Sequence, residues 1–170
     1  MKFLYLLILI LLLSCSNEKL EGPQTYVDVA MQILDETSLQ LKKEKNLHTF
    51  GNGGGMLYCV ERMHLALLSY EDYTFEQKRG LIIYALETLL QNVNDNEKIR
   101  KDLCQYPFKI ENLSIDLSFR SSKDRNDPSA IIFIYASKGK ITYVCSTKEG
   151  RLKETYEETY EEAKSHLGKQ

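Results

Sequence analysis

Several features that mark other classes of protein are missing from this sequence. It has no tryptophan and no Cys-x-x-Cys pair, and its 22 basic residues do not outnumber its 24 acidic ones. The missing cysteine pair excludes a thioredoxin-like redox motif. The lack of a basic excess argues against a nucleic-acid-binding protein, because such proteins neutralise phosphates with a basic surface. The unbroken apolar run of residues 3–13 is also too short for a transmembrane helix, which needs about 20 residues.

That apolar run has the length of the hydrophobic region of a secretory signal, and it ends in Leu12-Leu13-Ser14-Cys15. These four residues resemble the lipobox of bacterial lipoproteins. By this resemblance, residues 1–14 are a cleaved signal peptide and Cys15 becomes the N-terminus, modified with a diacylglycerol thioether. Residues 15–24 would be the lipidated cysteine and a polar tether, and Ser16 resembles the signal for delivery to the outer membrane. The alternative is ordinary cleavage after Ser16, which would release a secreted protein.

The rest of the chain has the composition of one folded domain, residues 25–170. The whole sequence is 43% apolar and 27% charged, which fits a globular protein rather than a disordered one. Three cysteines remain in it, Cys59, Cys104 and Cys145. In an oxidising envelope they allow one intramolecular disulfide at most, and their default interpretation is as small buried apolar residues.

Apolar spacing predicts helices in the first part of this domain. Residues 25–43, 56–70 and 74–93 place apolar side chains three or four positions apart, as on one face of a helix. Thr74 and Gln77 form a capping box for the third of these. A short helix is expected at residues 97–105, stopped by Pro107. Residues 46–55 hold four glycines and are predicted to be a loop.

The apolar period changes to two in the second part. A strand is predicted at residues 113–120, an exposed loop at 121–129, and two strands at 131–136 and 141–145 joined by a tight turn at Lys138-Gly139. From Leu152 onward the spacing predicts a C-terminal helix. The expected fold class is therefore α+β, with N-terminal helices, a three-stranded antiparallel meander and a C-terminal helix in a two-layer domain.

Three runs in this domain also carry a family resemblance: Gly53-Gly54-Gly55-Met56, Glu97-Lys98-Ile99-Arg100 with the later Tyr106-Pro107-Phe108, and Tyr156-Glu157-Glu158-Thr159-Tyr160-Glu161-Glu162-Ala163. They resemble landmarks of an uncharacterised family of small chlamydial-type envelope lipoproteins. The resemblance covers most of the domain and implies an envelope location without implying an activity.

The glycine cluster is the first candidate site. Gly51, Gly53, Gly54 and Gly55 precede the helix predicted at residues 56–70, and successive N–H groups before a helix can hold an anion. The cluster lacks the Lys-Ser/Thr of a P-loop and the spacing of a dinucleotide-binding motif. A hinge or a tight packing site is the favoured interpretation.

Three residues of the helix predicted at 56–70 form a weaker candidate. Cys59 and His64 are a thiol and a base, but five positions place them on different sides of a helix. Glu61 and His64 share a face, which favours a surface hydrogen bond over half of a metal site. His48 and His166 are isolated in the sequence.

Two further groups have plain structural explanations. Asp124, Asn126 and Asp127 lack the glycine and the glutamate of a calcium loop and are interpreted as a solvated turn. Tyr156 and Tyr160 offer aromatic surface to a partner, although packing on the sheet is the favoured explanation.

These observations favour a non-enzymatic, membrane-anchored envelope lipoprotein that faces the periplasm from the outer membrane and acts as a binding or structural module. Its expected partners are the membrane, through the lipid on Cys15, and another envelope protein. No catalytic residue, cofactor, metal or nucleic acid is expected. The alternative is a small periplasmic ligand-binding protein or hydrolase that uses the glycines of residues 51–55.

Overall fold

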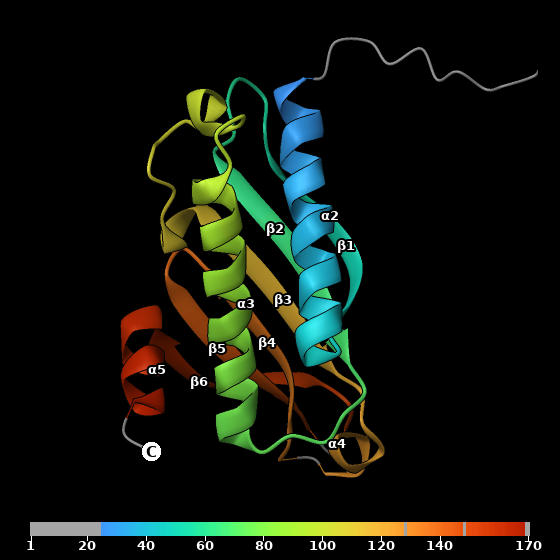
Figure 1. Cartoon of the computed structure of the whole chain (residues 1–170). Coiled ribbons are helices and arrows are strands. Elements are labelled where there is room, and N and C mark those ends of the chain that lie inside the picture. The colour runs from blue at the N-terminus through green and yellow to red at the C-terminus, as the bar shows by residue number, and fades with distance from the viewer. Residues whose placement is uncertain (1–24, 128, 148, 169–170) are drawn as a thin grey trace, which may run out of the picture.

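The computed structural model describes residues 25–127, 129–147 and 149–168 (Figure 1). Its helices and strands are, in chain order, α2 (Tyr26–Lys45), β1 (His48–Gly55), β2 (Arg62–Ser69), α3 (Phe75–Asp95), β3 (Leu113–Phe119), α4 (Ser122–Asn126), β4 (Ile131–Ser137), β5 (Lys140–Ser146), β6 (Leu152–Thr159) and α5 (Tyr160–Leu167). The predicted signal peptide and tether lie outside the described residues. Within the described part, no helix is long and apolar enough to cross a membrane.

The six strands form one sheet in which they lie in sequence order, β1 to β6. Neighbouring strands are antiparallel except for β2 and β3, which are parallel. Parallel neighbours need a crossover connection, and α3 supplies it. The predicted α+β class is therefore confirmed, but the three-stranded meander is wrong because β3, β4 and β5 are the middle of a larger mixed sheet.

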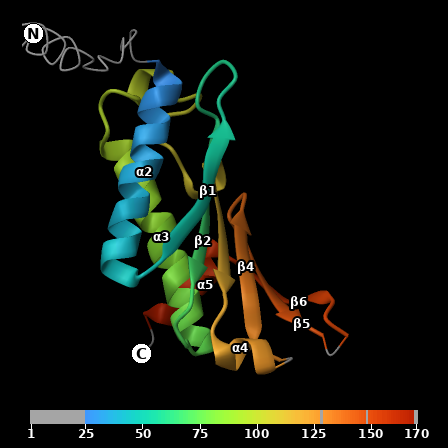
Figure 2. The ribbon, with the colours of Figure 1, turned by 90° about the vertical axis from the view of Figure 1, so that its right-hand side faces the viewer.

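Helices α2, α3 and α5 lie on one face of this sheet, and the short α4 lies at its lower end in these views (Figures 1 and 2). Helix α2 packs on β1 and β2, α3 packs beside α2 and on β3, and α5 packs against α3 and β6. The core lies between the two layers, and its largest fully buried side chains include Ile33, Leu34, Leu41, Met63, Leu65, Leu67, Ile82, Leu86, Leu89 and Tyr143. No helix of the described chain covers the opposite face of the central strands, which carries half-buried polar side chains such as His64, Ser114 and Asp116.

The two long helices begin where the sequence predicts. Thr25 caps α2 and Thr74 caps α3, each in a reciprocal capping box with the residue three positions later. Asn46 ends α2 in the left-handed conformation, with φ of 53°. The predicted strands β3, β4 and β5 are confirmed, as is the turn between the last two, where Lys138 and Gly139 both have positive φ.

The predictions for residues 46–70 are wrong. The predicted loop contains β1, and the predicted helix at 56–70 is a connection followed by β2. Strand β2 lies inside the sheet, so alternate residues such as Met63 and Leu65 face the helices while Ala66 is buried on the other face. The resulting run of apolar residues has no clear period of two and fits either element. Four glycines are tolerated in β1 because it is an edge strand that pairs on one side only.

Three other predictions need correction. Residues 97–105 form only a single 3-10 turn, Arg100–Asp102, because their backbone pairs with the β1–β2 connection: Val60 donates to the Asp102 carbonyl and Cys104 donates to the Val60 carbonyl. The predicted exposed loop contains α4, in which Asp124 is buried. The predicted C-terminal helix starts only at Tyr160, because residues 152–159 pair with β5 as strand β6.

Candidate interaction surface

Strand β1 forms one edge of the sheet, and no described residue pairs with its outer side (Figure 2). An edge strand presents a row of unpaired N–H and C=O groups to any other extended chain. Proteins usually protect such edges with charged residues or proline. Residues 49–55 contain neither, and although a bulge interrupts β1 between Thr49 and Gly51, residues 51–55 keep a regular register with β2, so this stretch is open to pairing with another strand.

The four glycines singled out in the sequence all lie in β1. A Cβ atom at Gly54 would collide with the carbonyl oxygen of Arg62, whereas a Cβ atom at Gly53 would meet nothing within 4 Å. Gly54 is thus needed for the close approach of β1 and β2. This agrees with the interpretation of the glycines as a tight packing site. Because the glycines are followed by a connection and a strand, no helix N-terminus adjoins them, and the premise of an anion cradle is lost.

A groove with a volume of about 340 Å³ lies between β1 and the flank of α2. It is lined by Asp35, Ser38, Leu39, Lys42, His48 and Thr49. The Leu39 side chain is 69% exposed, and the hydroxyl of Thr49 is buried without a hydrogen-bond partner. An unpaired buried hydroxyl costs stability unless something bonds it. That hydroxyl is closed off from solvent, so the groove offers an incoming side chain chiefly the apolar surface of Leu39.

The two ends of the groove have opposite charge. Helix α2 and strand β1 run in opposite directions, so Lys42 lies near His48 while Asp35 lies near Asn52, which donates a hydrogen bond of 2.9 Å to it. The first turn of α2 is acidic and its last turn is basic. The groove is consequently polarised along its length.

Phe50 adds apolar surface at the open edge. The register between β1 and β2 shifts between Thr49 and Gly51, so Phe50 is an extra residue in β1. Its side chain is 63% exposed. A bulge of this kind re-aims a side chain, and here it leaves a large aromatic ring in solvent beside the groove.

The other residues predicted on one helix are not on a helix. Cys59 forms a disulfide with Cys104, so neither is a free nucleophile; of the three cysteines in the described part of the chain, Cys145 is free and buried. His64 lies on β2, where Nδ1 is 3.0 Å from the Ser114 hydroxyl and Nε2 is 3.9 Å from the Asp116 carboxylate. This trio lies on the uncovered face of the sheet, and no cavity described here includes it. Among the described residues, no cluster of three or more His, Cys, Asp or Glu is placed to hold a metal.

A buried polar cluster between α3 and β6 was not predicted. Glu158 is 4% exposed and accepts hydrogen bonds from Arg79, Tyr143 and Tyr156, and His166 Nδ1 lies 3.3 Å from its second oxygen. Burial and the nearby carboxylate raise the pKa of Tyr143 well above its usual value. The cluster fastens β6 and α5 to α3, which is a structural role. Tyr160, one of the two tyrosines proposed for docking, is buried, while Tyr156 is 41% exposed.

A second buried ion pair joins α3 to α4. Lys78 Nζ donates to Asp124 Oδ1 at 2.7 Å and to the Ile131 carbonyl. The sequence does carry a signal for both pairs, because Lys78 and Arg79 interrupt the apolar pattern near the start of α3. A basic residue at a core-facing position implies a buried acidic partner, but the spacing does not identify that partner.

The groove and the open edge of β1 are thus the candidate interaction surface of the described chain. None of the family models, curated proteins or solved structures compared with this chain matches it.

Proposed function

We propose that this chain is an envelope lipoprotein, held by a lipid on Cys15 to the outer membrane and facing the periplasm, whose domain binds an extended segment of another envelope protein. It acts as a binding module rather than as an enzyme. The residues 12–15 that resemble a lipobox support the anchor. The open, uncharged edge of β1 beside the groove on α2 supports the binding role.

The edge of β1 is the observation that carries this proposal. An extended segment added to β1 gains main-chain hydrogen bonds from the edge, and its alternate side chains then reach the groove. Leu39 in the groove and Phe50 in β1 provide exposed apolar surface. Affinity would come from the main-chain bonds, and specificity from the groove.

The polarity of the groove defines the chemistry of the segment. Acidic side chains of the partner fit the end that carries Lys42 and His48, and basic ones fit the end that carries Asp35. At the centre, apolar side chains would cover Leu39. The proposed partner is therefore an amphipathic strand with opposite charges at its two ends.

A second copy of this chain is a poorer occupant of the edge. Side-chain pairs across neighbouring strands stabilise a sheet. Two β1 strands paired over residues 51–55 would bring mostly glycines against glycines, since Asn52 is the one residue there with a side chain, and such pairs contribute nothing of this kind. A segment with larger side chains would instead pack over the glycines.

Site-specific cross-linking in the native membranes tests this function. A photoreactive amino acid in place of Phe50 should give one discrete adduct with another envelope protein. Leu39→Ser should weaken that adduct, while Leu152→Ser on β6, where the side chain is equally 69% exposed, should not. An adduct unaffected by Leu39→Ser, or one that contains two copies of this chain, would contradict the proposal. Intact mass spectrometry of the same sample tests the anchor, which requires a mass that begins at Cys15 and includes the diacylglycerol.

A further inference from the structure

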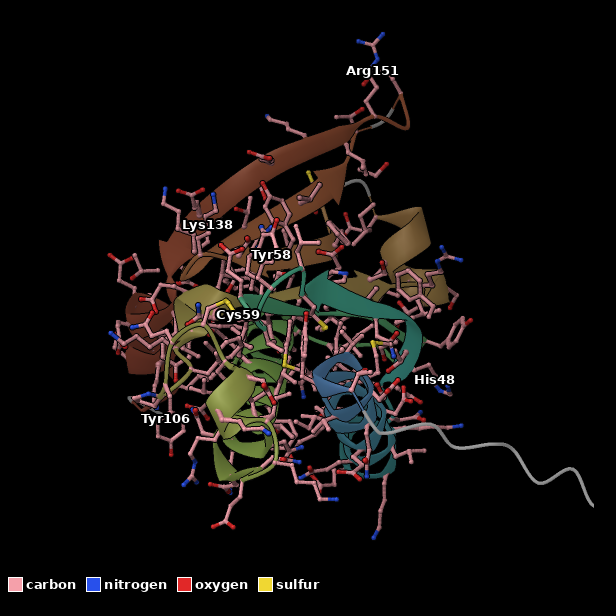
Figure 3. The ribbon with its side chains drawn as sticks, turned by 90° about the horizontal axis from the view of Figure 1, so that it is seen from above. His48, Tyr58, Cys59, Tyr106, Lys138 and Arg151 are labelled. Carbon is pink, nitrogen blue, oxygen red and sulfur yellow. A yellow bond between two sulfur atoms is a disulfide. The ribbon has the colours of Figure 1, made fainter. Side chains whose placement is uncertain are left out.

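One end of the domain gathers three segments that are distant in sequence: the first turn of α2, the β1–β2 connection at residues 56–61, and the α3–β3 connection at residues 98–108. Tyr26 of α2 donates hydrogen bonds to the carbonyls of Met56 and Leu57, at 3.1 and 3.0 Å. The disulfide between Cys59 and Cys104 joins the two connections. Figure 3, seen from this end, shows Tyr58, Cys59 and Tyr106 on it. We name these segments the tether end.

Large apolar and aromatic side chains project from the tether end. Leu57 is 78% exposed, Tyr58 is 89% exposed and Tyr106 is 49% exposed. These exposed fractions are high, because folding usually buries more of such large apolar and aromatic side chains. The disulfide and the Val60–Leu103 bridge hold their backbones in place, so the exposure is a fixed property of the surface and not of a loose end.

Charged residues of both signs lie in the same three segments as these apolar side chains, with Asp28 and Glu61 exposed and Asp102 half-buried. Lys98, Arg100 and Lys101 are exposed on the α3–β3 connection, and the Arg100 guanidinium lies 4.8 Å from the centre of the Tyr106 ring. Tyrosine is enriched where membrane meets water, because its ring is apolar and its hydroxyl is polar. Lysine and arginine near such rings interact with lipid phosphates. The tether end therefore has the chemistry of a membrane-interface surface.

The short chain distance between Cys15 and the tether end also favours a membrane as the partner of this surface. Thr25 caps the first turn of α2 at the tether end, and only residues 16–24 separate it from Cys15. Ten residue steps span at most about 35 Å when fully extended. Helix α2, with 20 residues, carries the chain about 30 Å further from that end. An anchor on Cys15 thus brings the tether end within reach of the bilayer, but a tether as long as α2 leaves the orientation of the domain to be set by the surface that docks.

We propose that the tether end docks on the bilayer that holds the lipid, with Leu57 and Tyr58 at the level of the lipid headgroups. This inference rests on the anchor of the proposed function. In this docked orientation α2 would point away from the membrane. The edge of β1, which lies beside α2, would remain accessible to a partner. The lipid alone would tether the domain; the tether end would also orient it.

The absence of tryptophan permits a direct test. Tyr58→Trp introduces the sole indole of the full-length protein. Tyr70→Trp is the matched control, because Tyr70 is also exposed, at 57%, but follows the far end of β2. Each lipidated variant is reconstituted into phosphatidylcholine–phosphatidylglycerol vesicles with and without brominated acyl chains. The indole at position 58 should shift to the blue and lose most of its emission with the brominated lipid, while the indole at position 70 should be unaffected.

A second variant separates insertion from mere proximity. Leu57→Asp, added to Tyr58→Trp, should restore most of the emission, because a carboxylate opposes insertion; Leu39→Asp on the same background should not. Equal quenching at positions 58 and 70 would overturn the docking and leave the anchor intact. The same conclusion would follow if position 58 showed no quenching in protein that has the lipidated mass and co-floats with the vesicles. An unlipidated mass would overturn the anchor, and the docking with it.

Discussion

Arg79 of α3 and Glu158 of β6 form a hydrogen-bonded ion pair, Nε to Oε1 at 2.8 Å, in which both side chains are almost completely buried. Removing Glu158 leaves the buried Arg79 only its pair with the partly exposed Glu76, and it leaves the buried Tyr143 hydroxyl without its acceptor. Glu158→Ala is therefore expected to lower the free energy of unfolding by about 3–5 kcal/mol, as measured by urea denaturation. The neighbouring Glu157→Ala is the control, because Glu157 is exposed and pairs with Lys140 at the surface. Similar losses in the two variants would contradict the structural role of the cluster.

The disulfide between Cys59 and Cys104 should stabilise the domain through its unfolded state. It closes a loop over a sequence separation of 45 residues, which corresponds to about 4 kcal/mol of lost chain entropy. The double variant Cys59→Ser, Cys104→Ser should unfold at a correspondingly lower denaturant concentration, and reducing agent should shift the native protein in the same direction. Cys145→Ala should retain the response to reducing agent, since Cys145 is not in the disulfide.

Two adjacent glycines of β1 should differ sharply in their tolerance of alanine. Gly54→Ala places a methyl group against the Arg62 carbonyl and is expected to cost about 1–3 kcal/mol. Gly53→Ala meets open space and should leave stability unchanged or raise it by up to about 1 kcal/mol, because alanine restricts the unfolded chain. Thermal unfolding of the two variants checks this order. Equal effects would mean that β1 and β2 do not approach as described.

Glu87 should contribute to the acid sensitivity of the domain. Burial raises the pKa of Glu87, but Lys164, 2.7 Å away, and the Tyr160 hydroxyl outweigh it, so the pKa lies below the usual 4.5. The carboxylate therefore stabilises the fold above pH 4.5, and that contribution is lost as the pH falls through the lowered pKa. Glu87→Gln should be less stable than the native protein at neutral pH, and the difference should shrink below pH 4.5. Unfolding curves that differ by the same amount at every pH would contradict this.

The elements that the sequence predicts correctly carry strong local signals. Thr25 and Thr74 cap long amphipathic helices, and the alternation in β3 leaves one face polar, so both periods can be read without knowledge of the rest of the chain. Strand β2 carries no such signal, because its apolar residues lie on both faces of the sheet. In β6, Glu158 is buried only because Arg79 meets it, about 80 residues earlier in the chain. The local sequence around residue 158 therefore cannot reveal that Glu158 is buried.

The candidate surface was predictable only in part. The glycines were a candidate site in the sequence. Their role depends on the position of β1 at the edge of the sheet, which follows from its pairing with β2 alone. The exposure of Leu39 and Phe50 depends on the groove and on the bulge, neither of which has a sequence signature. The tether end depends on the disulfide, and three cysteines alone did not identify the pair that forms it.

The parallel pairing of β2 with β3 has a consequence for the order in which the chain is made. Strands β1 and β2 are synthesised together, but β3 appears only after the whole of α3. Until then β2, with its fully buried Leu65 and Leu67, has no neighbour on one side. A nascent chain that pauses after α3 would thus expose the apolar side chains of β2 and be prone to aggregation. One that pauses after β5 would lack only a largely exposed, charged strand and a short helix.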